Sequence, residues 1–331
     1  MYRNNFYIDE IFSDSFVIDK DDYIFCLNRV IEILNFEDPS IRARDTNFQP
    51  GGVIKLNRDL DTIIVPDLHA RTYFIQKLLN FKINNKSVLE LLQLSKLQIV
   101  FVGDGFHSEK RHKERWFKIE SEAVNNFINH ENSDLEMAES LGVMKYVINL
   151  KILFPDQIHF LKGNHENILN ENGGGNFPFG KFTLEGEIVK KWVSKFLGED
   201  FLWKYSSFEK SLPLIAIGKN FIVSHAEPKK FYSLDQLINC YNNSDVVFGL
   251  TWTRDNQSED GSVFNMLKEY IDKDMLDNAL YFTGHQTIDG LYELRAYGKL
   301  VQIHNPNRCI IAHISFDKDI DLNNDIGDID G

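Results

Sequence analysis

The stretch TIIVPDLH, residues 62–69, begins as an apolar run and ends in the pair Asp67-x-His69. Its first four residues are rich in β-branched side chains, as in a buried strand. In α/β proteins, acidic and polar side chains at the carboxyl ends of strands build the functional site. The stretch therefore predicts an α/β fold with a site that starts at Asp67 and His69.

The same pattern, a strand followed at once by a polar side chain, recurs four times. The later examples are Gln98–Val102 before Gly103-Asp104, Gln157–Leu161 before Gly163-Asn164-His165-Glu166, a hairpin around Gly218-Lys219-Asn220 before Ser224-His225, and Tyr281–Thr283 before Gly284-His285. One Asp or His at a strand end is more often a turn former or a structural histidine. Five of them together supply oxygen and nitrogen ligands for two adjacent divalent metal ions.

Between these strands the sequence predicts mainly helices. Apolar residues at helical spacing indicate a helix over residues 20–36, and Thr72–Phe81 is a second one. The pattern Ser87-Val-Leu-Glu90 is a capping box that opens a third helix, and Ser133-Asp-Leu-Glu136 is interpreted as the start of another, which ends before Pro155.

The chain is expected to form one large domain with additions at both ends. Residues 1–50 are predicted to be a helical extension packed on the core, and residues 51–316 the main domain with a helical insertion at about 107–150. The glycine-rich segment 172–180 is predicted to be a mobile loop. Residues 317–331 are Asp-rich and lack aromatics, so they are predicted to be an acidic disordered tail.

Composition excludes several classes of function. With 43% hydrophobic and 26% charged residues the chain has the composition of a globular protein. Its formal net charge of -13 opposes binding to long nucleic acids. Three scattered cysteines indicate neither a disulfide framework nor a zinc knuckle. We find neither a signal peptide nor a membrane helix in the sequence and expect a cytoplasmic protein.

The order of the five polar motifs resembles the calcineurin-like metallophosphoesterase superfamily over roughly residues 60–310. Within it, the chain is most similar to the phosphoprotein (serine/threonine) phosphatase branch. That similarity extends to Ser211-Leu-Pro-Leu-Ile-Ala, Leu250-Thr-Trp252-Thr-Arg254, His285-Gln286 before Asp289-Gly290, and Asn305-Pro306-Asn307. The resemblance implies a four-layer αββα sandwich of two mixed β-sheets flanked by helices, with a metal site at the carboxyl ends of the strands.

The resemblance also implies a role for each motif residue. Asp67 and His69 would bind the first metal, Asp104 would bridge both, and Asn164, His225 and His285 would bind the second. His165 would be the unligated general acid. Arg254 would clamp the phosphate oxygens of the substrate, a bidentate task that suits a guanidinium, and Asn164 would also contact the substrate.

Two such cations about 3.5 to 4 Å apart lower the pKa of a bridging water, and the resulting hydroxide attacks phosphorus. Nitrogen and carboxylate ligands suit Mn, Fe or Zn better than Mg. Histidine has a pKa near working pH, so His165 can protonate the departing alkoxide.

The second motif departs from the branch pattern Gly-Asp-x-x-Asp-Arg-Gly. Here His107 stands in place of the second Asp and Ser108 in place of the phosphate-binding Arg. In one interpretation, Lys110, Arg111, Lys113 or Arg115 supplies the missing charge, while Glu109 or His107 orients His165. In the other, Glu109–Glu120 is a solvated helical surface with mixed charges. His107 and Arg111 are therefore further candidates for substrate contact.

The remaining histidines are expected to be structural. His304 lies inside a predicted apolar strand, where a hydrogen-bonded histidine is commoner than a metal ligand. His107, His112, His130, His159 and His313 receive the same default interpretation.

The expected function is metal-dependent hydrolysis of a phosphate monoester, in a protein or in a small phosphorylated metabolite, without a membrane or a long nucleic acid as partner. A phosphodiesterase or dinucleoside polyphosphate hydrolase is the alternative, because the same metal core serves both chemistries. A catalytically silent binding protein that keeps the fold is a third hypothesis, supported only by the altered second motif.

Overall fold

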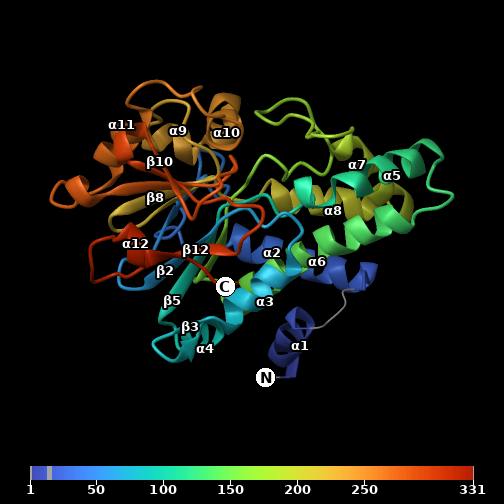
Figure 1. The fold of residues 1–331 in the computed structure, drawn as a ribbon, viewed down its shortest axis with the longest axis horizontal. Helices are drawn as coiled ribbons and strands as arrows, with labels where there is room; N and C mark the ends of the chain where they lie inside the picture. The colour runs from blue at the N-terminus through green and yellow to red at the C-terminus, as the bar shows by residue number, and fades with distance from the viewer. Residues whose placement is uncertain (1, 13–16, 331) are drawn as a thin grey trace.

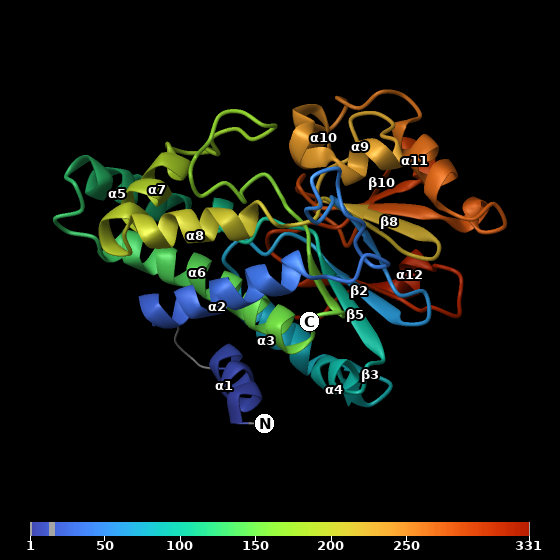
Figure 2. The same ribbon diagram turned by 180° about the vertical axis from the view of Figure 1, so that it is seen from behind.

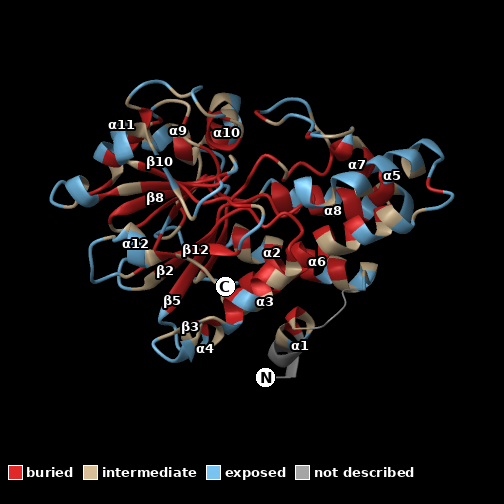
Figure 3. Ribbon diagram, in the orientation of Figure 1, coloured by how far each residue is buried: buried red, intermediate tan, exposed pale blue. Residues whose placement is uncertain are grey.

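The computed structural model describes residues 2–12 and 17–330 and shows two mixed β-sheets stacked face to face, with helices on both outer faces (Figure 1). The four-layer arrangement of two mixed sheets between helices is therefore confirmed. Burial follows the layers: the central strands of both sheets are buried, and the exposed residues are concentrated on the outer helices and loops (Figure 3).

One sheet has six strands in the order β1-β7-β8-β9-β11-β10. Its strands are β1 (Val53–Lys55), β7 (Ile215–Ile217), β8 (Phe221–Ser224), β9 (Leu280–Thr283), β10 (Glu293–Arg295) and β11 (Leu300–Gln302). Strands β7 and β8 form the expected antiparallel hairpin, with Ile217 opposite Ile222. Strands β8, β9 and β11 are parallel to one another, so their carboxyl ends lie at the same edge.

The other sheet has five strands in the order β13-β12-β2-β5-β6. They are β2 (Asp61–Val65), β5 (Leu97–Phe101), β6 (Ile158–Phe160), β12 (Ile310–Ile314) and β13 (Ile326–Asp328). Strands β2, β5 and β6 are parallel neighbours. Between the two sheets lies an apolar core that includes Ile64, Val100, Val223, Phe282 and Val301.

The outer face of the five-stranded sheet carries most of the helices (Figure 2). They are α1 (Tyr2–Ile11), α2 (Lys20–Asn35), α3 (Thr72–Asn80), α4 (Val88–Gln93), α5 (Lys113–Val124), α6 (Glu131–Leu153), α7 (Glu185–Phe196) and α8 (Glu199–Glu209). Helix α2 contacts α6 and α8. Ser87 and Glu90 form the predicted capping box at the start of α4. The short strands β3 (Lys82–Ile83) and β4 (Lys86–Ser87) form a separate hairpin.

The outer face of the six-stranded sheet is covered by α9 (Leu234–Ile238), α10 (Ser244–Thr251) and α11 (Ser262–Tyr270). The remaining helical turns are η1 (Glu109–His112), η2 (Cys240–Asn242), η3 (Leu276–Asn278) and η4 (Ala296–Gly298). Cys26, Cys240 and Cys309 are buried free thiols. Among the described residues, no helix combines the length and apolarity that crossing a membrane requires.

Two local predictions differ from the structure. Helix α6 begins at Glu131, and Ser133 is not its N-cap. The Ser133 hydroxyl instead donates to Glu122 Oε2 (2.7 Å), while Glu136 Oε2 accepts from the Ser108 hydroxyl (2.7 Å). The two polar residues thus join segments that are distant in sequence, which a local capping pattern does not reveal.

Most of the predicted disordered tail has a defined conformation. Helix α12 (Leu322–Asp325) leads into β13, which adds to the edge of the five-stranded sheet with Ala312 opposite Ile326. Ile326 is buried in the core between the sheets. Ile326, the partly buried Ile320, Leu322 and Ile329, and an open strand edge provide this order in spite of the acidic composition, so the prediction for residues 317–330 is wrong.

Candidate active site

The predicted metal ligands all follow strand ends at one edge of the sandwich. Asp67 and His69 follow β2, Asp104 follows β5, Asn164 follows β6, His225 follows β8 and His285 follows β9. Since β2, β5 and β6 are parallel in one sheet and β8 and β9 in the other, these ends meet. The site therefore lies where the carboxyl ends of both sheets come together.

Asn164, His225 and His285 form one tight group of donor atoms. Asn164 Oδ1 lies 3.0 Å from His225 Nε2 and 2.9 Å from His285 Nδ1, and these two nitrogens are 3.2 Å apart. Asp104 Oδ2 lies 3.4 Å from His225 Nε2. Atoms at such separations can all be ligands of one cation.

Asp67 and His69 form the second group, on the other side of Asp104. His69 Nε2 lies 3.7 Å from Asp67 Oδ2 and 3.8 Å from Asp104 Oδ2. Asp104 Oδ2 is thus close to a donor of each group, as the bridging position requires. The structure brings all six predicted ligands together.

Backbone contacts hold these side chains in place. Glu166 accepts from the backbone N–H groups of Asp104 (2.9 Å), Gly105 (2.9 Å) and Gly163 (2.6 Å), and so connects the loops after β5 and β6. A Cβ on Gly163 would lie 2.2 Å from Asp104 Oδ1, and one on Gly284 only 1.8 Å from Asp67 Oδ1. Both glycines are therefore required for the close approach of backbone and carboxylate.

The orientation of two imidazoles is fixed by main-chain carbonyls. His225 Nδ1 lies 3.0 Å from the Val102 carbonyl and His69 Nδ1 lies 3.2 Å from the Phe106 carbonyl. A carbonyl can only accept, so each Nδ1 carries the proton and each Nε2 presents its lone pair to the site. Hydrogen bonds of this kind fix the tautomer of metal-binding histidines.

The electrostatics of the site fit bound cations. Burial lowers the pKa of His69 to about 3 and, together with nearby Arg254, that of His285 to about 4, so both imidazoles are neutral. Burial raises the pKa of Asp67, and burial with nearby Glu166 and Asp67 raises that of Asp104. The two buried carboxylates have only neutral imidazoles around them. Divalent cations at this position would compensate the negative charge of the carboxylates.

His165 lies beside the ligand groups. Its backbone N–H donates to Asp104 Oδ1 (2.9 Å), and its Nε2 lies 3.8 Å from Asp104 Oδ2. The ring stacks on Phe179 with centroids 4.6 Å apart and remains partly exposed. Within the described part of the chain, its Nδ1 has no hydrogen-bond partner. The imidazole is thus positioned between Asp104 and the surface, where it can transfer a proton.

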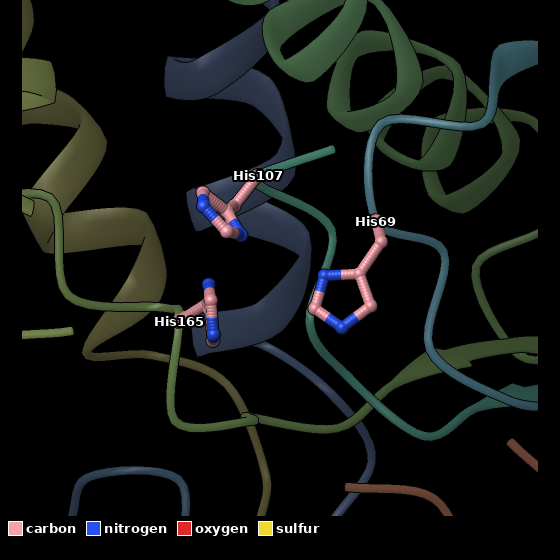
Figure 4. Close-up of side chains that lie close together, drawn as sticks. All are labelled: His69, His107 and His165. Atoms are coloured by element: carbon pink, nitrogen blue, oxygen red, sulfur yellow. The ribbon is translucent and has the colours of Figure 1, made fainter. Parts of the chain in front are cut away.

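His107 lies behind His165 and does not reach the surface. Figure 4 shows both rings together, with His69 beside them; the centroids of His107 and His165 are 5.2 Å apart. His107 is 1% exposed, and its Nε2 lies 3.5 Å from Glu185 Oε1. This burial is incompatible with direct substrate contact, and the two rings pack against each other, so an orienting role of His107 stays a prediction.

Arg254 and Arg111 have different environments. Arg254 is exposed near His285, whose pKa it lowers, and so it lies at the opening of the site. Arg111 Nη2 donates to the His69 carbonyl at 3.1 Å, which places it at the edge of the first metal group. Arg115 points away, toward Glu136 and Glu139 on α6. Most of the basic run is therefore a helical surface, as the simpler interpretation expected.

Three more residues lie at this site: from the sequence, Glu109 is predicted only as a candidate to orient His165, His304 as structural, and Lys181 not at all. Glu109 is 7% exposed and lies 3.4 Å from His69 Nε2, and Lys181 pairs with it at 3.1 Å. His304 is fully buried, 3.9 Å from Asp67 Oδ2. Strand β11 ends at Gln302, so His304 follows a strand end like the other site residues. That position is a local signal for the site, while the contact of His304 Nε2 with Glu109 Oε2 (3.2 Å) is a hydrogen bond of the kind the structural interpretation expected.

Comparisons with known proteins agree with the geometry. A family model described as calcineurin-like phosphoesterase matches residues 60–315. A probable serine/threonine-protein phosphatase of Encephalitozoon cuniculi is 25% identical over 174 residues, which are 47% of this chain and 35% of that protein. The match thus spans about a third of the relative's length.

Two solved structures illustrate the structural similarity. A serine/threonine phosphatase from Saccharomyces cerevisiae, described as similar to human phosphatase PP5, superimposes with a TM-score of 0.54 at 14% identity and covers 90% of this chain and 83% of its own. A cold-active protein-tyrosine phosphatase of a Shewanella species gives a TM-score of 0.44 at 12% identity, with 84% and 82% covered. The first of these supports the fold.

Proposed function

The chain belongs to the calcineurin-like phosphoesterase family, and from this premise we propose that it is a metal-dependent phosphatase that hydrolyses phosphate monoesters. The observation that carries the proposal is that Asp104 lies between two groups of buried donor atoms, with His165 beside it. The proposed ligands are Asp67, His69 and Asp104 for one cation and Asp104, Asn164, His225 and His285 for the other.

The donor set determines which cations suit the site. Three imidazoles, two carboxylates and an amide oxygen favour Mn, Fe or Zn over Mg, which prefers oxygen ligands. Two such cations supply the positive charge that polarises the phosphoryl group and lowers the pKa of a water molecule. Residues of the chain perform the remaining tasks.

His165 is the proposed proton donor. Its ring is held by the backbone hydrogen bond to Asp104 and by stacking on Phe179. In this position it is close to the reacting centre and remains outside the proposed ligand set. Burial and nearby His69 and His107 hold the pKa of His165 well below its usual value, so its protonated form is a strong acid. That form gives its proton to the alkoxide oxygen as the ester bond breaks, and the leaving group departs as a neutral alcohol.

Arg254 is the proposed phosphate-binding residue. It is exposed at the opening of the site, and its positive charge helps to lower the pKa of His285. A guanidinium can donate two parallel hydrogen bonds to a phosphoryl group. Ser108 occupies the place where the resemblance predicts a second arginine, and Glu136 binds both its backbone N–H and its hydroxyl, each at 2.7 Å. Binding of the substrate's phosphoryl group therefore depends strongly on Arg254.

Phosphoserine or phosphothreonine in proteins is the proposed substrate class, with small phosphorylated metabolites as the alternative. Support comes from the resemblance of the motifs and from the curated relative, which is described as a probable serine/threonine-protein phosphatase. The fold itself is shared by enzymes of different specificity and gives no preference.

Purified protein is expected to release phosphate from an aryl phosphate monoester when Mn²⁺ is added. It should lose this activity in excess chelator, because the proposed reaction depends on the bound cations. The assay compares the monoester with an aryl phosphodiester and with phosphoserine and phosphothreonine peptides. Faster diester hydrolysis would replace the proposal by a phosphodiesterase. Inactivity on every substrate with Mn, Fe and Zn would support a silent binding protein.

Arg254→Ala is expected to lower kcat/KM for the monoester by roughly 10 to 100-fold, because charge-assisted hydrogen bonds contribute about 1.5 to 3 kcal/mol. Arg254→Lys should recover only part of this loss, since an ammonium group cannot make the bidentate contact. Arg58→Ala is the matched control, because Arg58 is an exposed arginine paired with Asp272. Equal kinetics of the Arg254 and Arg58 variants would exclude Arg254 from phosphate binding.

A further inference from the structure

Glu109 is the last buried residue before the chain becomes exposed at Lys110 and Arg111. His107 and Glu109 both have positive φ angles, 78° and 53°, which are unfavourable for residues with a side chain. The turn they form directs the Glu109 carboxylate into the site, while the following Lys110 stays exposed. Such a conformation persists only where surrounding contacts maintain it, and it is commonest at functional sites.

The Glu109 carboxylate lies between two imidazoles of the first metal group. Its Oε1 is 3.4 Å from His69 Nε2, and its Oε2 is 3.2 Å from His304 Nε2. His304 Nε2 is in turn 3.9 Å from Asp67 Oδ2. Neither Glu109 nor His304 belongs to the six ligands proposed above, yet their donor atoms point to the same place.

These separations fit a common cation. Donor atoms about 2.1 Å from one ion are about 3.0 Å apart at a right angle and about 4.2 Å apart when opposite. The distances of Glu109 Oε1 to His69 Nε2, Glu109 Oε2 to His304 Nε2 and His304 Nε2 to Asp67 Oδ2, 3.2 to 3.9 Å, fall inside this range, with Glu109 using a different oxygen for each imidazole. The ligand atoms of Asp67, His69 and His304 also lie within 4.8 Å of one another.

The burial of His304 and the charge of Glu109 also favour a cation at this position. His304 is fully buried; its Nε2 is within hydrogen-bond distance of Glu109 Oε2, and among the described residues its Nδ1 has no hydrogen-bond partner. Glu109 adds a third carboxylate to Asp67 and Asp104, and the basic side chain that pairs with it, Lys181, is 49% exposed. A half-solvated ammonium compensates a buried carboxylate poorly, whereas a divalent cation at the meeting point would do so well.

We propose that Glu109 and His304 are additional ligands of the first cation, which is then enclosed by five protein donors. The five are Asp67, His69, Asp104, Glu109 and His304. The second cation would have the four protein donors proposed above, and so more coordination positions free for substrate or water than the first. This inference rests on the proposed function and makes the two sites unequal: the first ion is held tightly, and the second site is the more open to substrate.

The experiment titrates the metal-free full-length protein with Co²⁺ and follows the bound ions by calorimetry and by visible absorption. Wild type is expected to bind two ions per chain, one clearly tighter than the other. Glu109→Gln and His304→Gln should each weaken the tight site by at least about 100-fold, because even outer-shell partners of a ligand contribute 10 to 100-fold. The absorption of the tight site should change, and the weaker site should keep its affinity.

Three variants serve as controls. Glu114→Gln, on the exposed face of α5, and His313→Gln, whose ring pairs with Asp61, should bind both ions like wild type. Lys181→Met removes the ion-pair partner of Glu109 without removing a ligand, so the tight site should keep its affinity. If Glu109 acted only through that ion pair, Glu109→Gln and Lys181→Met would both leave the affinities unchanged.

The outcomes separate this inference from the function on which it rests. Two ions bound with wild-type affinities by both Glu109→Gln and His304→Gln, in protein with native circular dichroism, would overturn the inference alone. No ion bound by wild type would overturn the proposed function as well. If His304→Gln does not fold, the nearly isosteric Glu109→Gln decides, together with the spectrum of its tight site.

Discussion

Asp104→Asn is expected to lower kcat/KM for the monoester by about 10³-fold, which corresponds to roughly 4 kcal/mol of transition-state stabilisation. The reason is the central position of Asp104 Oδ2, which lies 3.8 Å from His69 Nε2 and 3.4 Å from His225 Nε2. Asparagine keeps the shape of the side chain but replaces a charged oxygen between the two proposed cation sites with a neutral group.

This substitution is conservative for the fold. The amide oxygen of asparagine can still accept from the backbone N–H of His165, as Asp104 Oδ1 does now at 2.9 Å. We therefore expect native circular dichroism, together with fewer bound metal ions per chain. The measurements are steady-state kinetics with saturating Mn²⁺ and the metal content after gel filtration.

Asp272→Asn is the matched control, because Asp272 forms an exposed ion pair with Arg58 away from the site. It should keep wild-type turnover and metal content. Should Asp104→Asn also keep both within a factor of three, Asp104 would not be the bridging ligand. The proposed metal centre would then have to be rejected.

His165→Ala is expected to lower kcat by 10² to 10⁴-fold for a substrate with a poor leaving group, such as an alkyl phosphate, because that alkoxide needs a proton as it departs. A substrate with a good leaving group, such as a nitrophenyl phosphate, should lose much less. Metal content should not change, since His165 is proposed as a proton donor and not as a ligand.

The leaving-group dependence distinguishes a proton donor from a residue that only shapes the site. Equal losses for alkyl and aryl substrates would exclude the acid role, and loss of bound metal would make His165 a ligand. His130→Ala is a suitable control: His130 pairs with Asp134 at the start of α6, is partly exposed and lies apart from the proposed ligands. It should leave both substrates unaffected.

The strands and their ends were predictable because local sequence determines them. A short apolar β-branched run such as Ile63–Val65 favours a strand, and the polar residue after it marks the strand's end. The capping box at Ser87 and Glu90 was also confirmed, because both partners lie within one helical turn. The similar pattern at Ser133 failed because Glu122 and Ser108, remote in sequence, are the actual partners.

The same distinction applies to the C-terminal segment. Its acidic composition indicates disorder when the segment is considered alone. In the structure Ile326 enters the core between the sheets and β13 pairs with β12. The free strand edge that accepts β13 exists only after the rest of the sheet has formed.

The sequence by itself determined the α/β fold, the order of the strand-end motifs and the six candidate ligands, because each of these depends on residues that are close neighbours in the chain. Tertiary structure alone decided that Glu109 and His304 lie beside His69 and Asp67, with Lys181 paired to Glu109. They come from a tight turn, a loop and the end of β11, which are far apart in the sequence. Burial of a charge depends on what packs around it, and that is set by the contacts between these distant segments.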